Sequence, residues 1–283
     1  MGSPVVVGAI CLIVAEALFA GIGALVKHLS TDMNQFQLVF FRNLFALIAL
    51  MPWILRMGKV GLKTEHFGLH LLRSTSGLIA MYCFFYVLAH IPLAQAMMAL
   101  LVAPFIVPII ARIWLKELIS HKSLMAIGLG FIGAGFILRP EGENMNLFIL
   151  LALICATLVA FTKCTIRKLS GSEPPARIVF YFTFLATIVS LVPMLLNWHA
   201  LPEAVWKWLG LMGVMAAAGQ LLMTKAFQLA SPVRIGLLTY SSVFFAALLG
   251  YIFWAEPISA GLIGGAVLII WAANMTLRQR WLW

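Results

Sequence analysis

The sequence is poor in charged residues, in cysteine and in acidic side chains. Only 10% of its 283 residues are charged, against about 25% in soluble globular proteins. The four cysteines, Cys11, Cys83, Cys155 and Cys164, lie inside apolar runs without metal-ligand spacing, so we expect packing residues rather than a disulfide framework or a metal site. A soluble domain, a disordered chain and a secreted disulfide scaffold are therefore excluded.

Motifs for catalysis and for nucleotide binding are also missing. The chain has no H-E-x-x-H, no paired aspartates within an apolar run and no G-x-x-x-x-G-K-[ST]. Its six histidines are scattered, and no aspartate falls within a predicted span. The sequence thus predicts that the protein is not an enzyme, needs no cofactor and is not driven by ATP.

The sequence contains long hydrophobic runs instead. Hydrophobic residues make up 63% of the chain and the mean hydropathy is +1.05, and a helix needs about 20 apolar residues to cross a bilayer. The pattern predicts an all-α integral membrane protein with ten transmembrane helices. The predicted spans are Pro4–Lys27, Gln35–Arg56, Phe67–Ala89, Leu93–Leu115, Ser120–Leu138, Leu147–Leu169, Pro174–Leu196, Val205–Leu229, Pro232–Trp254 and Pro257–Leu277.

The basic residues between these spans are distributed unevenly. Thirteen of the 19 Lys and Arg fall on the side that both termini share, three fall on the opposite side (Lys27, Arg139 and Lys207), and three lie inside spans. Cytoplasmic loops carry such an excess. We therefore expect both termini in the cytoplasm and a plasma membrane location, typically the bacterial inner membrane. The net charge of +10 is then an orientation signal rather than a sign of nucleic-acid binding.

An internal repeat has an offset of 140 residues. Segment 27–30 aligns with 167–170, segment 38–41 aligns with 178–181, and Pro92 aligns with Pro232. The chain thus divides into five-span repeats at 1–140 and 141–283. Because five is odd, the second copy is predicted to be inverted in the membrane, and inverted halves favour alternating access to a central site.

The repeats resemble those of the drug/metabolite transporter superfamily, in particular the EamA-like type. The resemblance is carried by Phe40-Phe41-Arg42, Arg73, Pro104, and Glu117 followed by the glycine-rich fifth span that leads to Pro140. The second half keeps Glu256 but has Val243 in place of Pro104. The resemblance implies a secondary transporter whose cavity is lined by spans one to four and six to nine. It also implies substrates such as amino acids, S-adenosylmethionine, riboflavin or nucleotide-linked sugars.

Two charged residues lie deep in the first two predicted spans. Charge in the hydrocarbon core costs about 2.5–3.5 kcal/mol on insertion scales, so such residues are functional candidates. Glu16 and Arg42 lie at similar depths in adjacent spans, which makes an ion pair between them an expectation. Arg42 is predicted to bind a substrate anion, with Glu16 as its counter-ion or as a proton carrier; a fixed structural pair is the alternative.

The two other basic residues inside spans are Arg73 and Lys163. Both lie about six residues from a span end, so their long side chains can extend toward the inner interface. Snorkelling is one prediction for them and lining the cavity is the other. Three deep bases against one deep acid favour an anionic or carboxylate-bearing substrate.

Neutral polar side chains and prolines complete the predicted site. A ligand site combines apolar walls with a few placed polar groups, and the candidates are Tyr82, Gln95, Tyr181, Gln220 and Tyr240. For each of them an interhelical hydrogen bond is the alternative. Pro104 and Pro108 remove backbone donors in the fourth span, which predicts either a gating kink or a static bend.

Together these patterns predict a secondary active transporter for a small polar metabolite that carries a carboxylate, such as an amino acid or an amino-acid derivative like S-adenosylmethionine. A larger planar anion of the riboflavin type is the alternative substrate. A channel or a membrane partner without transport activity is the alternative class. The predicted partners are the substrate and the lipid bilayer but no nucleic acid, and either a monomer or a homodimer is compatible with the sequence.

Overall fold

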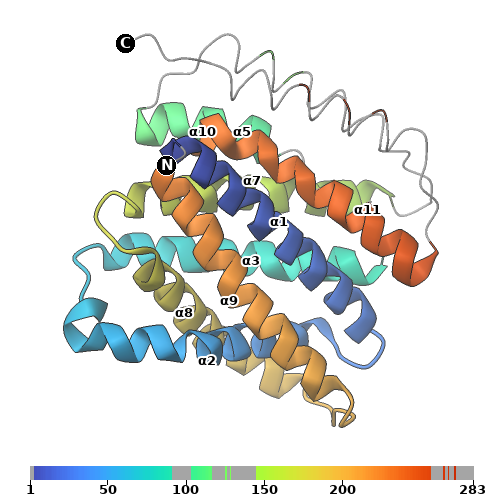
Figure 1. The fold of residues 1–283 in the computed structure, drawn as a ribbon. Coiled ribbons are helices and arrows are strands. Elements are labelled where there is room, and N and C mark those ends of the chain that lie inside the picture. Colours follow the sequence, from blue (N-terminus) through green and yellow to red (C-terminus); the bar gives the residue numbers. More distant parts are fainter. Residues whose placement is uncertain are drawn as a thin grey trace.

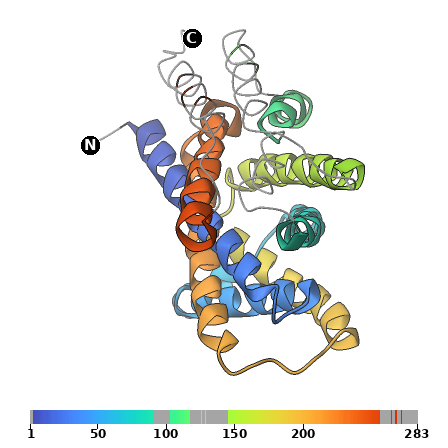
Figure 2. The ribbon, with the colours of Figure 1, turned by 90° about the vertical axis from the view of Figure 1, so that its right-hand side faces the viewer.

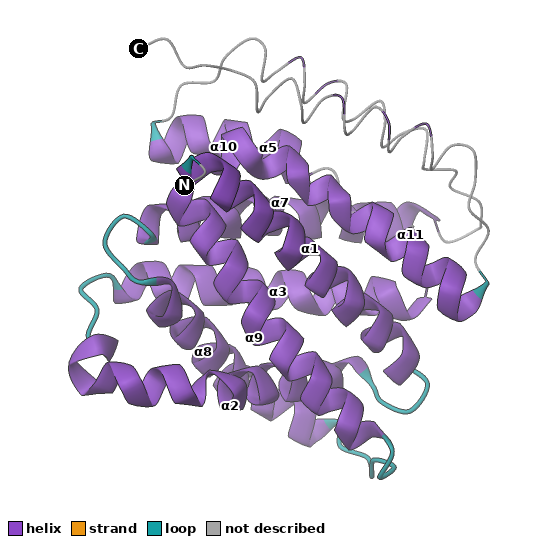
Figure 3. Ribbon diagram, viewed as in Figure 1, coloured by secondary structure: helices purple, strands orange, loops and turns teal. Residues whose placement is uncertain are grey.

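The protein is a bundle of long helices joined by short connections (Figures 1 and 3). The computed structural model describes residues 3–90, 103–116 and 145–255, together with five single positions: Met125, Gly128, Gly264, Val267 and Trp271. The predicted fifth and tenth spans therefore lie mostly outside the described residues, as do Gln95, Glu117 and Glu256.

Three long helices make up the described start of the first repeat. They are α1 (Pro4–Leu29), α2 (Gln35–Leu62) and α3 (Phe67–His90). The apolar span of α2 ends at Gly58, whose φ of 63° interrupts the helix, and a left-handed φ of this kind is one that glycine adopts without steric cost. The fourth predicted span is described as α5 (Ala103–Ile110), followed by a π-helical turn at Ala111–Leu115.

The second repeat has the same succession of elements. The helices are α7 (Met145–Leu169), α8 (Pro175–Leu196) and α9 (Val205–Leu229). The ninth predicted span follows in three pieces: α10 (Pro232–Ile235), a 3-10 segment at Gly236–Tyr240, and α11 (Ser241–Trp254). Broken helices are tolerated at membrane depth where they are buried in protein or line a cavity.

Six of the described segments are long and apolar enough to cross a membrane. They are Pro4–Leu29, Gln35–Gly58, Phe67–His90, Pro175–Leu196, Val205–Leu229 and Pro232–Trp254. Each begins within one residue of a predicted span and ends within two. The sequence thus located these helices well because polar or helix-breaking residues flank each apolar run.

The helices pack in pairs, and the repeat relates one pair to another. With the offset of 140 residues, α1 corresponds to α7, α2 to α8, α3 to α9 and α5 to α11. The structure packs α1 along α9 and correspondingly α3 along α7, while α2 packs against α8. It also packs α1 against α11 and α5 against α7, so that α7 lies between α3 and α5 (Figure 2). Each repeat therefore completes its packing with helices of the other.

Small residues allow the closest of these contacts. In α9, a Cβ added at Gly213 would lie 2.6 Å from the backbone carbonyl carbon of Phe45 in α2, so only glycine lets these two helices approach so closely. The largest buried cluster fills the space among α1, α2, α3, α8 and α9, with Leu38, Leu88 and Leu209 almost fully buried. This packing fixes the helix faces that point toward the centre of the bundle.

Candidate functional site

A cavity of about 170 Å³ lies inside the bundle and receives side chains from both repeats. Its polar and charged lining comes from α1, α2, α3, α7, α9 and the 3-10 segment, and α8 contributes an aromatic ring. The residues concerned are Glu16, Arg42, Arg73, Thr162, Lys163, Gln220, Thr239 and Phe182. None of the described residues of the fourth span lines this cavity, whereas the resemblance implied that this span would.

The acid of the cavity is paired with a lysine of the other repeat. Glu16 Oε1 lies 4.0 Å from Lys163 Nζ, and Lys163 Nζ donates a hydrogen bond of 2.9 Å to the hydroxyl of Thr239. Both charged side chains are about 95% buried. The expected pair between Glu16 and Arg42 is therefore wrong. Depth along adjacent spans placed the two residues at one level, but it did not reveal which way each helix face points.

Two arginines meet over one aromatic ring in the same cavity. Arg73 Cζ lies 3.6 Å from the centre of the Phe182 ring, and Arg42 Cζ lies 5.8 Å from the same centre. A cation within about 6 Å of a ring face is attracted by the quadrupole of the ring. Phe182 thus helps to hold two like charges side by side in a buried space.

The structure decides between the two predictions for Arg73 and Lys163. Arg73 is fully buried and Lys163 is 5% exposed, and both line the cavity. Snorkelling to the interface is thus the wrong prediction for both residues. A partner on another helix holds each side chain inside, because Lys163 contacts Glu16 and Thr239 while Arg73 Nη2 donates to Gln220 Oε1 at 2.6 Å.

The charges of the cavity are not balanced. Glu16 neutralises Lys163, but in the part of the chain that the structure describes no carboxylate forms an ion pair with Arg42 or Arg73. In addition, Nε and Nη1 of Arg73 are buried and have no hydrogen-bond partner among the described residues. Buried polar groups are normally paired because leaving them unpaired costs about 1–3 kcal/mol. The cavity therefore presents positive charge and free donors to a ligand.

Gly77 keeps the space beside these donors open. It lies one turn after Arg73 in α3 and lines the cavity. A Cβ added there would lie 3.0 Å from Cε2 of Phe182 and 3.4 Å from Nη1 of Arg73. Glycine inside a helix is unfavourable by about 0.5–1 kcal/mol relative to alanine, so its position here is explained by the close approach of the ring and the guanidinium.

The tyrosines predicted for the site lie elsewhere in the described structure. Tyr82 packs against Phe36, and its hydroxyl is buried without a hydrogen-bond partner among the described residues. Tyr181 donates a hydrogen bond of 2.8 Å to the carbonyl of Leu62, and Tyr240 is buried in the 3-10 segment. None of the three lines the cavity. Their roles as substrate ligands stay predictions without geometric support in this conformation.

The remaining predicted residues are glutamines and prolines. Gln220 lines the cavity and accepts from Arg73, while Gln95 lies outside the described residues. Pro104 and Pro108 are both buried in α5, which continues into the π-helical turn. The sequence interpretation did not include Phe182, Gly77 or Thr239. For Phe182 a signal exists, because the repeat offset places it opposite Arg42.

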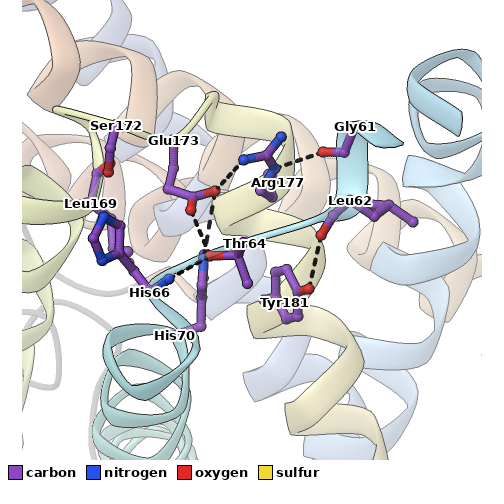
Figure 4. A network of polar contacts seen from close by, with 10 residues as sticks. All are labelled: Gly61, Leu62, Thr64, His66, His70, Leu169, Ser172, Glu173, Arg177 and Tyr181. Carbon is purple, nitrogen blue, oxygen red and sulfur yellow. Dashed lines mark hydrogen bonds and ion pairs between the residues drawn. The ribbon is translucent and has the colours of Figure 1, made fainter. Parts of the chain in front are cut away.

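A second polar cluster joins the two repeats at one end of the bundle (Figure 4). Glu173, in the connection between α7 and α8, accepts hydrogen bonds of 2.9 Å from Arg177 Nη1 and 2.5 Å from the hydroxyl of Thr64. His70 Nε2 lies 3.7 Å from the same carboxylate, and the His70 ring lies on that of Tyr181 at a centroid distance of 4.4 Å. Arg177 also donates to the carbonyl of Gly61. The cluster thus ties the α7–α8 connection to the end of α2.

The opposite end has a related set of contacts with different chemistry. Asn34 Nδ2 donates to the carbonyl of Asn197 at 2.7 Å, and Gln37 Nε2 donates to the carbonyl of His199 at 2.8 Å. These contacts join Asn34 in the α1–α2 connection and Gln37 in the first turn of α2 to the α8–α9 connection. The repeat equivalents of these elements are the ones joined by Glu173 and Arg177. One end is therefore held by a buried carboxylate and the other by carboxamides.

The sequence model of the EamA-like transporter family matches residues 6–139 and again residues 146–278. The chain belongs to the EamA-like transporter family. It is thus an integral membrane protein of two EamA repeats, a transporter of small metabolites and not an enzyme.

Several curated bacterial transporters are similar to this family member over most of their length. A pseudopaline exporter of Pseudomonas aeruginosa is 30% identical, with 96% of each chain covered. A riboflavin transporter of Brucella anthropi is 29% identical and covers 86% of this chain and 87% of its own. An S-adenosylmethionine uptake transporter of Rickettsia bellii is 27% identical, and the match covers 86% of this chain and 84% of the relative. These relatives carry different substrates in different directions.

The fold is also found among solved structures. A crystal structure of a protein matches with a TM-score of 0.77 at 13% sequence identity, and the match covers 96% of this chain and 95% of that chain. At this level of identity the match supports the architecture alone.

Proposed function

We propose that this family member is a secondary active transporter that moves a small carboxylate-bearing metabolite, such as an amino acid or an amino-acid derivative, by alternating access. The observation that carries the proposal is the pair Arg42 and Arg73. Both guanidinium groups line one buried cavity beside Phe182, and no described carboxylate neutralises them. A substrate carboxylate would supply the missing charge and accept from the free donors of Arg73.

The size of the cavity supports a small substrate. Its volume of about 170 Å³ is below the range of about 300–1,000 Å³ that is typical of sites for drug-sized ligands. A planar anion of the riboflavin kind is the second candidate. It is favoured by the four phenylalanines of the lining, Phe19, Phe84, Phe85 and Phe182, and by the riboflavin transporters among the relatives.

The exchange of helix pairs between the repeats supports the alternating-access part of the proposal. Contacts of α1 with α9 and of α3 with α7 are equivalent under the repeat, so the same sequence elements can form either of two related arrangements. We propose repeats at 1–140 and 141–283, ten spans with the second five inverted, and both termini in the cytoplasm. A monomer completes the cavity from its own helices, so the proposal requires no second copy.

The proposed function is tested by counterflow in proteoliposomes. Vesicles are preloaded in turn with amino acids, S-adenosylmethionine or riboflavin, and entry of a labelled trace of the same compound is followed. We expect accumulation with a carboxylate-bearing preload and at least about a tenfold loss in Arg42→Ala, since removing one partner of a charged contact costs about 2 kcal/mol or more. Lys225→Gln is the matched control, because Lys225 is an exposed base of α9 outside the cavity.

Two results would contradict the proposal. Folded protein that shows no counterflow with any preload would point to a channel or to a membrane partner without transport activity. Equal counterflow in the wild type and in Arg42→Ala would remove Arg42 from the substrate path. Preference for riboflavin over every small carboxylate would select the second candidate.

A further inference from the structure

Each of the two cavity arginines is held by a neutral carboxamide rather than by a carboxylate. Arg42 Nη1 donates to Oδ1 of Asn43 at 2.8 Å, and Arg73 Nη2 donates to Oε1 of Gln220 at 2.6 Å. A carboxylate would bind a guanidinium more strongly than an amide does, because the hydrogen bonds are then charge-assisted at both ends. The choice of the weaker partner at both positions therefore needs an explanation.

Other cations inside the bundle do have acidic partners. The buried Lys163 is paired with Glu16 in the same cavity, and the partly exposed Arg177 is paired with the buried Glu173 at the end of the bundle. The fold thus accepts buried carboxylates beside bases. Only at Arg42 and Arg73, within the described residues, do the buried cations contact carboxamide oxygens instead.

The orientation of the Asn43 amide is fixed by a second contact. Asn43 is fully buried, and its Nδ2 donates a hydrogen bond of 2.8 Å to the carbonyl of Val39. Since a carbonyl only accepts, the nitrogen of the amide must face Val39 and the oxygen must face Arg42. Gln220 is 8% exposed and lines the cavity, with its oxygen toward Arg73. Both amides therefore position a guanidinium without neutralising it.

We propose that Asn43 and Gln220 are positioning residues that set the charge selectivity of the transporter. They hold Arg42 and Arg73 in place while leaving two positive charges for an anionic substrate, which is preferred over its neutral amide. The inference rests on the proposed function and deepens it by naming the residues that select for negative charge. Gln220 then acts through Arg73 rather than as a direct ligand of the substrate.

The test converts each amide into the carboxylate of the same shape. Gln220→Glu and Asn43→Asp keep the acceptor oxygen but neutralise the neighbouring arginine. The matched control is Gln228→Glu on the same helix, where Oε1 of Gln228 accepts from the exposed Lys225 at 3.0 Å. The control makes the same chemical change beside a base outside the cavity.

Binding is read from purified protein with defined probes. The thermal unfolding temperature is titrated with succinate and with its diamide, succinamide, at constant ionic strength. Wild type and Gln228→Glu are expected to be stabilised by succinate at about tenfold lower concentration than by succinamide. The reason is that pairing a buried charge raises the binding affinity by about tenfold. In Gln220→Glu and in Asn43→Asp this preference is expected to fall severalfold, because one of the two positive charges is neutralised. Without ligand, Gln220→Glu should unfold near the temperature of the wild type, whereas Asn43→Asp should unfold at a lower temperature because it loses the donor to the carbonyl of Val39.

The outcomes separate the inference from the proposed function. The inference is overturned, and the proposed function kept, if the wild type prefers succinate and a folded Gln220→Glu or Asn43→Asp keeps the full preference. A wild type that shows no preference overturns the anion site itself and the inference with it. Gln220→Met provides a further check, since it removes the acceptor without adding charge. It should weaken succinate binding severalfold but keep the preference over succinamide, whereas loss of the preference would contradict a role through charge.

Discussion

Arg42 and Phe182 stand at equivalent positions of the two repeats, 140 residues apart, and their side chains meet in one cavity with 5.8 Å between Arg42 Cζ and the ring centre. The repeat therefore places a base from one half against an aromatic ring from the other. Arg73 likewise has Gly213 as its repeat equivalent, and that glycine allows α9 to approach α2. The scaffold is duplicated, but its charged lining is not.

The ring of Phe182 is predicted to contribute to substrate affinity through the arginines. Phe182→Leu keeps an apolar side chain but removes a cation–π contact worth about 0.5–2 kcal/mol. We expect the KM for a carboxylate substrate to rise by about two- to thirtyfold, measured by counterflow. Phe184→Leu changes an exposed ring of the same helix and should leave KM unchanged. Equal KM values in both variants would contradict this role.

Gly77→Ala is predicted to obstruct the space beside Arg73. The added Cβ would press on Phe182 and approach Arg73 Nη1, so we expect about a tenfold loss of substrate affinity, which corresponds to about 1.4 kcal/mol. The control is Gly68→Ala in the same helix, where a Cβ would meet no atom within 4 Å. If Gly77→Ala binds substrate as well as the control does, the open space beside Arg73 has no role in binding.

Glu16 is predicted to couple transport to protons. In Glu16→Gln the side chain keeps its shape but can no longer gain or lose a proton. We expect transport to continue with a flattened dependence on pH, measured as uptake driven by an imposed pH gradient in proteoliposomes. Glu65→Gln, in an exposed connection, serves as the control. Normal transport with an unchanged pH dependence in Glu16→Gln would show that this carboxyl group does not carry the coupling.

The cluster around Glu173 is predicted to stabilise the folded protein. Glu173→Ala would leave the partly exposed Arg177 and Thr64 without their acceptor, and a hydrogen bond to a charged group contributes about 1.5–3 kcal/mol. The unfolding temperature in detergent should fall clearly below that of Glu203→Ala, which removes an exposed acid. A fall of the same size in both variants would mean that the cluster contributes little.

The orientation in the membrane can be tested with single cysteines in a cysteine-free background. Ser172 lies in the exposed α7–α8 connection and Asn197 lies in the exposed α8–α9 connection. The distribution of basic residues predicts that Ser172 faces the cytoplasm. A membrane-impermeant maleimide should then label Asn197→Cys in intact cells and Ser172→Cys only after permeabilisation. The reverse pattern would invert the predicted topology.

Sequence alone was sufficient to locate the described helices, the repeat and the deep charges. Apolar runs of spanning length are flanked by residues such as Pro175 and Pro232, which begin helices and so mark the boundaries in the sequence itself. The cost of burying charge in lipid likewise singles out Glu16, Arg42, Arg73 and Lys163 wherever they point. The structure places all four on one cavity.

Only the tertiary structure decided which of these charges are partners. Glu16 was expected beside Arg42 from depth, yet it pairs with Lys163 from the other repeat, because α1 and α7 present these side chains to a common space beside Thr239. Depth follows from the distance along one helix, whereas partnership depends on the rotation of each helix about its axis and on the packing of both repeats. The same packing brings Phe182 and Gln220 to the two arginines. The sequence determined which charges are buried, and the packing of the two repeats decided which of them remain free for a substrate.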